Sequence, residues 1–123
     1  TMREVTNLMG NLSFYLLFER KFEEARQFAN FGLMIDSSQI FIKTNLGHAF
    51  LFAGQTNRAL EIYQELVKTP DPDNLPNTFR ETLLKDFEIF SEAGLRSRDL
   101  PKMVEFVSGK KLGPKERLRY LPQ

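Results

Sequence analysis

Apolar side chains recur along most of the chain at the three- and four-residue spacing that marks one face of a helix. Leu8, Leu12, Tyr15 and Leu16 follow this spacing, and their helix should end near residues 19–21. A second helix should follow, with these side chains facing inward: Phe22, Ala25, Phe28, Ala29, Gly32 and Leu33. The pattern therefore predicts a hairpin of two helices at the start of the chain.

A second hairpin is predicted directly after the first. Helices are expected over about 39–53 and 56–68, with a turn at Gly54, because glycine can take the left-handed backbone angles that end an α-helix. The side-chain oxygens of residues 36–38 are expected to cap the third helix. Segment 69–77 carries three prolines and should be a loop.

The third hairpin is the least regular. Residues 78–93 again show helical spacing, closed by Gly94, and a short partner helix is expected over about 100–108. Asp99 should cap this partner, with Pro101 in its first turn. The three hairpins predict an all-α fold of about six helices.

The first two hairpins repeat one another. An offset of 34 residues superposes Asn11 on Asn45, Leu12 on Leu46, Leu17 on Leu51, Phe18 on Phe52 and Ala25 on Ala59. A fixed period of this length is the signature of stacked helical repeats. A helical bundle is the alternative fold, but bundles have helical spacing without a fixed repeat length.

The second copy resembles the tetratricopeptide repeat at Leu46, Gly47, Phe50, Ala59 and Tyr63. Small side chains such as Gly47 and Ala59 would let two helices cross closely, and the larger ones would fill the space beside the crossing.

The first copy matches the same pattern with Leu12, Ser13, Leu16 and Ala25, and then departs from it. Ala29 stands where the family usually has an aromatic residue. Met9 and Lys43 replace the family's tryptophan, and Ser37 replaces the usual proline between repeats.

The resemblance implies a right-handed α-α superhelix of stacked antiparallel hairpins. Repeat 1 would cover about 5–38, repeat 2 about 39–72 and a capping hairpin about 78–108, all within a domain of residues 1–109. The first helix of each repeat would line a concave groove that receives an extended peptide or a partner's helix. The implied partner-binding residues are Asn7, Asn11, Phe14, Leu17, Phe18, Phe41, Asn45, His48 and Phe52.

The expected groove is apolar and aromatic. Family members that grip terminal carboxylates use lysine and arginine there, whereas Gly10, Phe14, Thr44 and His48 supply no cation. The two asparagines could bond a peptide backbone, so the groove suits a hydrophobic ligand better than an acidic one.

The sequence gives no sign of an active site, and we expect no enzyme activity, no cofactor and no metal. The chain has no cysteine and one histidine, His48, so thiolate sites and paired-histidine metal sites are excluded. No glycine-rich phosphate loop is present, and a lone histidine on such a surface is more often a hydrogen-bonding residue than a catalyst.

Charge changes the expectation only at the end of the chain. Residues 110–123 hold five of the 17 basic side chains and one of the 16 acidic ones. We expect this segment to be a basic, flexible tail with one helical turn at about 116–121. Such a tail could contact nucleic acid, although five charges with one stacking aromatic residue are more typical of a linker.

No apolar stretch reaches the roughly 20 residues that cross a bilayer, so no membrane span is expected. Thr1 precedes Met2, which indicates an expression remnant or a piece of a longer protein. The compartment stays open, with the cytoplasm as the expectation. The leading hypothesis is a protein-binding module of a larger multidomain protein; the alternative is a homodimer scaffold that uses the same surface.

Overall fold

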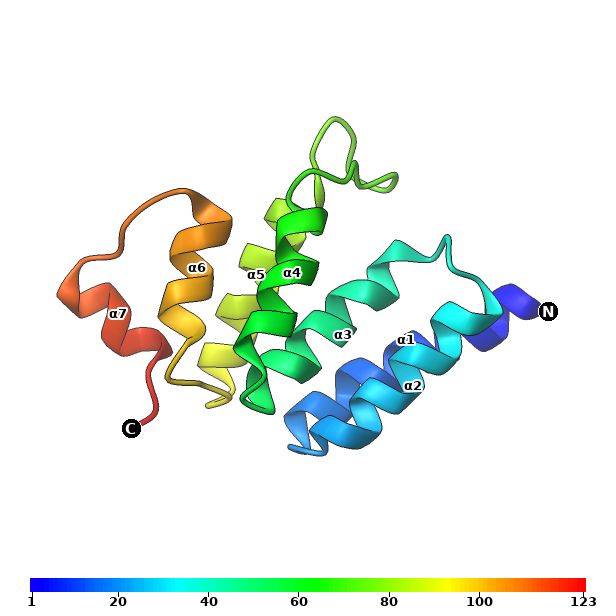
Figure 1. Ribbon diagram of the computed structural model, residues 1–123, viewed down its shortest axis with the longest axis horizontal. Coiled ribbons are helices and arrows are strands. Elements are labelled where there is room, and N and C mark those ends of the chain that lie inside the picture. Colours follow the sequence, from blue (N-terminus) through cyan, green and yellow to red (C-terminus); the bar gives the residue numbers. More distant parts are fainter. The chain divides into compact units, whose positions relative to one another are not determined.

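The computed structural model describes all residues 1–123 and contains seven α-helices and no strand (Figure 1). The expected all-α class is confirmed, and the expected number of about six helices is one too few. The helices are α1 Met2–Phe18, α2 Phe22–Ile35, α3 Ile40–Phe52, α4 Thr56–Leu66, α5 Phe79–Glu92, α6 Leu100–Ser108 and α7 Pro114–Tyr120.

The chain divides into two compact units, residues 1–62 and residues 63–123. The division falls inside α4, between Ile62 and Tyr63. Unit 1 holds α1, α2, α3 and the first part of α4, and unit 2 holds the rest. Each unit is described by itself.

In unit 1, α1 packs against both α2 and α3, and α2 also packs against α3 (Figure 1). The crossing of α1 and α2 is tight because its side chains are small. Ser13 Oγ donates a hydrogen bond of 2.8 Å to the carbonyl oxygen of Ala25, and both residues are buried. Ala59, the counterpart of Ala25 in the second copy, is also fully buried.

Two glycines allow α3 to approach the first hairpin. A Cβ on Gly10 would lie 2.5 Å from Cε2 of Phe41. A Cβ on Gly32 would lie 2.9 Å from Cδ1 of Ile42 and 3.2 Å from Cβ of Met9. A side chain at either position would force these neighbouring side chains to shift, so glycine is favoured here by packing rather than by backbone angles.

The turn between α2 and α3 differs from the expected cap. Asp36 ends α2, and its carboxylate accepts bonds from the Ser38 amide at 3.0 Å, the Ser38 hydroxyl and the Gln39 amide group. Gln39 is the N-cap of α3, with no side-chain capping bond. The prediction that residues 36–38 cap α3 is therefore wrong: the carboxylate organises the turn instead. These bonds hold the pKa of Asp36 below its ordinary value.

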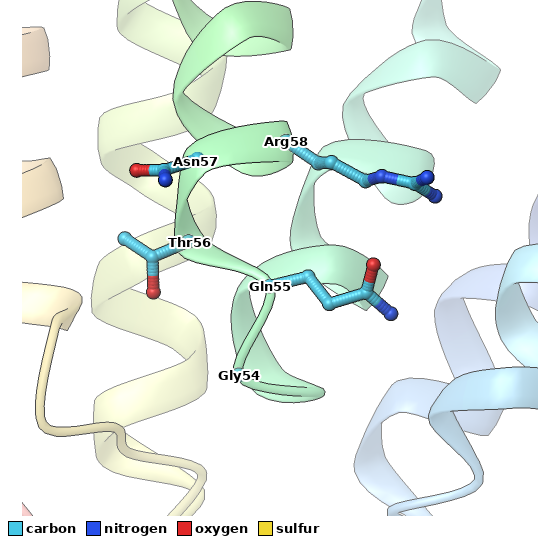
Figure 2. Close-up of a pocket in the computed structure, with 5 residues that line it drawn as sticks. All are labelled: Gly54, Gln55, Thr56, Asn57 and Arg58. Atoms are coloured by element: carbon cyan, nitrogen blue, oxygen red, sulfur yellow. The ribbon is translucent and has the colours of Figure 1, made fainter.

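The turn between α3 and α4 follows the sequence expectation. Gly54 has φ +83°, the left-handed conformation that favours glycine, and the Gln55 amide donates to the Phe50 carbonyl at 2.8 Å. The Arg58 guanidinium lies 5.4 Å from the centre of the Phe50 ring. Figure 2 shows the shallow hollow at this turn, lined by backbone and polar side chains.

In unit 2, α5 packs against α6, and both helices carry fully buried apolar side chains, among them Leu83, Phe87, Phe90, Leu100 and Met103. The Tyr63 ring meets the Phe87 ring edge-on, with centroids 5.5 Å apart. Burial raises the pKa of Tyr63 well above its ordinary value, and the nearby charge of Asp86 adds to this shift.

The proline-containing loop before α5 is held by a buried carboxylate. Asp71 accepts bonds from the Asp73 amide, the Asn74 side chain and the Thr82 hydroxyl, each 3.0 Å long. Thr78 caps α5 through its hydroxyl. Asp99 lies at the N-cap of α6 but makes no side-chain capping bond there, so its expected capping bond is absent.

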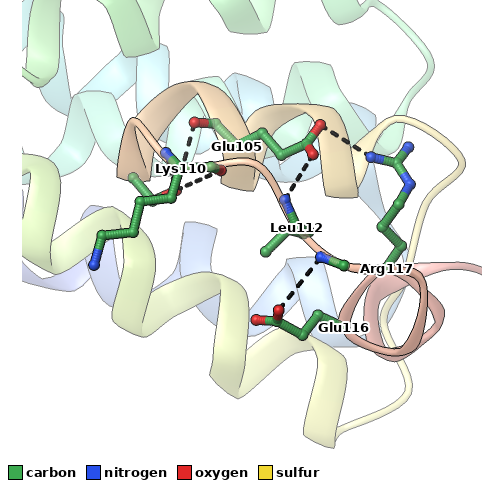
Figure 3. Close-up of polar contacts among 7 residues, drawn as sticks. Glu105, Lys110, Leu112, Glu116 and Arg117 are labelled. Atoms are coloured by element: carbon green, nitrogen blue, oxygen red, sulfur yellow. Dashed lines mark hydrogen bonds and ion pairs between the residues drawn. The ribbon is translucent and has the colours of Figure 1, made fainter.

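The seventh helix lies in the segment for which the sequence suggested one helical turn. Glu105 of α6 accepts a 2.8 Å hydrogen bond from the Leu112 amide and pairs with Arg117 at 2.9 Å (Figure 3). Tyr120 is buried, and α7 packs on α6. The backbone bond and, to a lesser extent, the cation lower the pKa of Glu105. These contacts with α6 thus stabilise a full helix where the sequence pattern predicted a single helical turn.

Candidate functional site

The nine residues predicted to bind a partner all lie in unit 1, on α1 and α3. The structure separates them by exposure. Asn7 and Asn11 are exposed on α1. Four phenylalanines are partly exposed: Phe14, Phe18, Phe41 and Phe52. We call these six residues the groove face.

The other three predicted residues are buried. Leu17 and His48 have no exposed surface, and Asn45 is almost as enclosed. Asn45 Nδ2 donates a 3.0 Å hydrogen bond to the carbonyl oxygen of Gly10, which ties α3 to α1. Burial corrects the expectation for these residues, because a side chain inside the packing of the helices cannot touch a partner in this conformation.

Ring contacts hold the aromatic side chains of the groove face in place. The Phe14 and Phe18 rings pack edge to face, with centroids 5.2 Å apart. The Phe52 ring stacks on Phe22 of α2 at 5.7 Å. Phe41 lies against the bare backbone of Gly10. Aromatic side chains fixed in this way lose little rotamer freedom when a ligand binds.

Phe22 also contributes to this surface, although its helical spacing predicted only an inward-facing side chain. It is the first residue of α2 and is partly exposed, and its ring supports Phe52. The helical period assigned it to the buried face of α2. The signal for its partial exposure was its position at the start of α2, just after the turn that follows α1. A residue at the end of a helix can reach a neighbouring helix.

The exposed atoms of the groove face are aromatic carbon and two side-chain amides. Such a surface can bury apolar side chains and can offer hydrogen bonds to a backbone, but it has no titratable group of its own. No group of three or more histidine, cysteine, aspartate or glutamate side chains is arranged to hold a metal ion. None of the seven helices has the length and apolar character needed to cross a membrane.

Comparison with known proteins adds no family. The chain matches no protein-family model, and neither a curated protein nor a solved structure is significantly similar to it. The likeness to tetratricopeptide repeats therefore rests on the residues of this chain, and any function must be argued from its geometry.

Proposed function

We propose that the chain is a protein-binding module whose first two helical hairpins are stacked as in tetratricopeptide repeats, and that the groove face receives an apolar peptide or partner helix. One observation carries the proposal: four phenylalanines of α1 and α3 remain partly exposed although they belong to one small helical unit. Exposed aromatic side chains that gather on one surface are typical anchors for a partner.

The packing of unit 1 supports the stacked arrangement. The third helix contacts both helices of the first hairpin, as a following repeat would. The small residues expected at the crossings, Ser13, Ala25 and Ala59, are all buried. The 34-residue period and this packing agree.

The two exposed asparagines give the groove face a second function beside apolar contact. Asn7 and Asn11 are one helical turn apart on α1, and Phe14 and Phe18 follow them in the next turns. An extended peptide on this surface could place apolar side chains against the rings and its backbone amides against the asparagines. No catalytic step is part of this proposal.

The experiment begins with selection of binding peptides from a random displayed library on the purified chain. The affinity of the strongest peptide is then measured by calorimetry for the chain and for Phe14→Ala and Phe52→Ala. Each substitution should weaken binding about tenfold or more, because aromatic anchors contribute most of the binding free energy at such surfaces.

Phe106→Ala is the matched control, since this exposed phenylalanine lies on α6 in unit 2. It should leave the affinity unchanged, and circular dichroism should show the same helix content in every variant. Equal loss of affinity for Phe14→Ala and Phe106→Ala, or no loss for either groove substitution, would contradict the proposal.

A further inference from the structure

The last helix, α7, is helical because it is docked on the rest of unit 2. It follows α6 through the short link 109–113. Its seven residues are far fewer than the roughly 12–15 that an isolated helix needs in water. The helical form of α7 therefore depends on its contacts with the other helices of unit 2.

One side chain of α7 is buried in this contact. Tyr120 is 7% exposed, and its carbonyl oxygen accepts a 3.3 Å hydrogen bond from the Ser97 amide. Leu118 is 65% exposed, because two residues turn the helix by about 200° and place it opposite Tyr120. The apolar contact that α7 makes is thus concentrated in a single aromatic side chain.

The other side-chain contacts of α7 with the rest of unit 2 join opposite charges. Arg119 Nη2 lies 3.2 Å from Glu88 Oε1 and 3.6 Å from Glu92 Oε1, both on α5. Arg117 pairs with Glu105 of α6 (Figure 3). All of these side chains are at least partly exposed, and exposed ion pairs contribute little to stability. Local opening of α7 therefore costs less free energy than unfolding of unit 2.

The surface that α7 covers is acidic on its own. A hollow of about 620 Å³ lies between α5 and the segment that contains α7. The lining from α5 consists of Glu81, Leu84, Lys85 and Glu88. The lining from the docked segment consists of Lys110, Glu116, Arg119 and Tyr120. Together with Glu92 and Glu105, which contact the arginines of α7, the surface left without this segment holds four carboxylates and one cation, Lys85. Arg96, one turn after Glu92, bonds the Ser91 carbonyl instead.

From the single buried ring, the exposed ion pairs and this acidic surface, we propose that the surface under α7 is a binding site for a basic segment of a partner protein. That segment carries an aromatic residue in the place of Tyr120, with arginine or lysine in the places of Arg117 and Arg119. The helix α7 shows which chemistry the site accepts, because it occupies the site through the same kinds of contact. The site uses unit 2 alone and the groove face uses unit 1, so either proposal can fail without the other.

The link limits the replacement of α7 by a partner segment. A short link holds α7 beside its site at an effective concentration on the order of 1 mM. A partner segment competes with this concentration, so its apparent affinity is reduced by the fraction of sites that α7 already fills. Any substitution that loosens α7 without changing α5 or α6 should therefore raise the affinity.

The probe is a fluorescent peptide with the sequence of residues 110–123, and fluorescence anisotropy measures its binding to the full chain. The variant Tyr120→Ala removes the buried ring from α7 and leaves α5 and α6 unchanged. This variant should bind the peptide at least about tenfold more tightly than the unchanged chain, because the site is vacant. In the same variant, Glu88→Gln or Glu105→Gln should weaken binding about threefold and reduce its salt dependence.

The matched control is the peptide with Leu118→Ala, since this side chain is exposed when α7 is docked. It should bind as tightly as the original peptide, whereas the peptide with Tyr120→Ala should not bind. Circular dichroism checks the helix content of each variant. If the chain with Tyr120→Ala is unfolded, Arg119→Gln takes its place, because it loosens α7 only at exposed ion pairs and should raise the affinity about threefold.

Three results would overturn the proposal. The first is equal binding of the peptide to the unchanged chain and to the loosened variants, which would place the peptide elsewhere. The second is no binding to any variant at about 1 mM peptide. The third is a dimer in sedimentation equilibrium that the peptide dissociates, since α7 of a second copy would then be the occupant.

Discussion

Asn11 and Asn45 occupy the same position in the two copies, and we predict that replacing them by alanine has different effects on stability. Asn45 is buried and bonds the Gly10 carbonyl, whereas Asn11 is exposed. Asn45→Ala should therefore destabilise the fold, and Asn11→Ala should leave the free energy of unfolding within about 0.5 kcal/mol of its original value.

The magnitude follows from the contacts of the buried amide. Loss of its 3.0 Å hydrogen bond removes about 1 kcal/mol net. The space left by a buried side chain adds a similar amount, because the surrounding helices close it only in part. Asn45→Ala should therefore lower the free energy of unfolding by about 1–3 kcal/mol in total. Since alanine favours a helix over asparagine equally at both sites, the difference between the two variants isolates the buried contact.

Urea unfolding followed by far-ultraviolet circular dichroism measures this difference. For a cooperative unit of the size of unit 1, residues 1–62, a loss of about 1 kcal/mol in the free energy of unfolding lowers Tm by about 4–8 °C. Thermal unfolding therefore gives an independent check. Equal changes for Asn11→Ala and Asn45→Ala would refute the reasoning. The result would mean that the amide contact between α1 and α3 does not hold unit 1 together.

Two further predictions concern packing and pH. Gly32→Ala should destabilise the fold by up to about 2 kcal/mol in urea unfolding, because crowding against Ile42 and Met9 costs about 1–3 kcal/mol and the better helix propensity of alanine returns about 1 kcal/mol. An increase in stability would show that these contacts are loose. The pKa of Glu105 is lowered in the folded chain, so its contribution to stability is present above its ordinary value of 4.5 and is lost as the pH falls below that value through the folded pKa. Hydrogen exchange at the Leu112 amide should accordingly lose protection in acid, after correction for the intrinsic rate, and Glu105→Gln should remove the pH dependence of this protection; an unchanged dependence in that variant would assign it to another group.

The helices could be predicted from the sequence because their signals are local. Apolar spacing, together with glycine at the ends of α3 and α5, placed the first six helices within a few residues of their observed bounds. The seventh helix depends on bonds from Glu105 to Leu112 and Arg117, which lie seven and twelve residues further along the chain. A local pattern cannot reveal a helix that is completed by contacts with another helix.

The candidate site was predicted less completely, for a related reason. The repeat register located the surface formed by α1 and α3, but it could not state which side chains remain accessible there. Asn45 and His48 fall on the predicted groove positions, yet both are buried. Leu8 and Tyr15 lie on the apolar face of their helix by the same spacing, yet both are exposed. The helical period identifies which residues share one face of a helix. Whether that face is buried depends on the element that packs over it.

The equivalent positions of the two copies lead to a more general argument about this fold. Leu8 and Ile42 are both apolar and share one place in the repeat, yet one is half exposed and the other is fully buried. In this pair the repeat places an apolar residue at the same position in both copies, while the free energy gained from it depends on whether a neighbouring helix covers it. At Ile42 that free energy already stabilises the chain. At Leu8 that free energy is not gained within the chain, because no helix covers the side chain there.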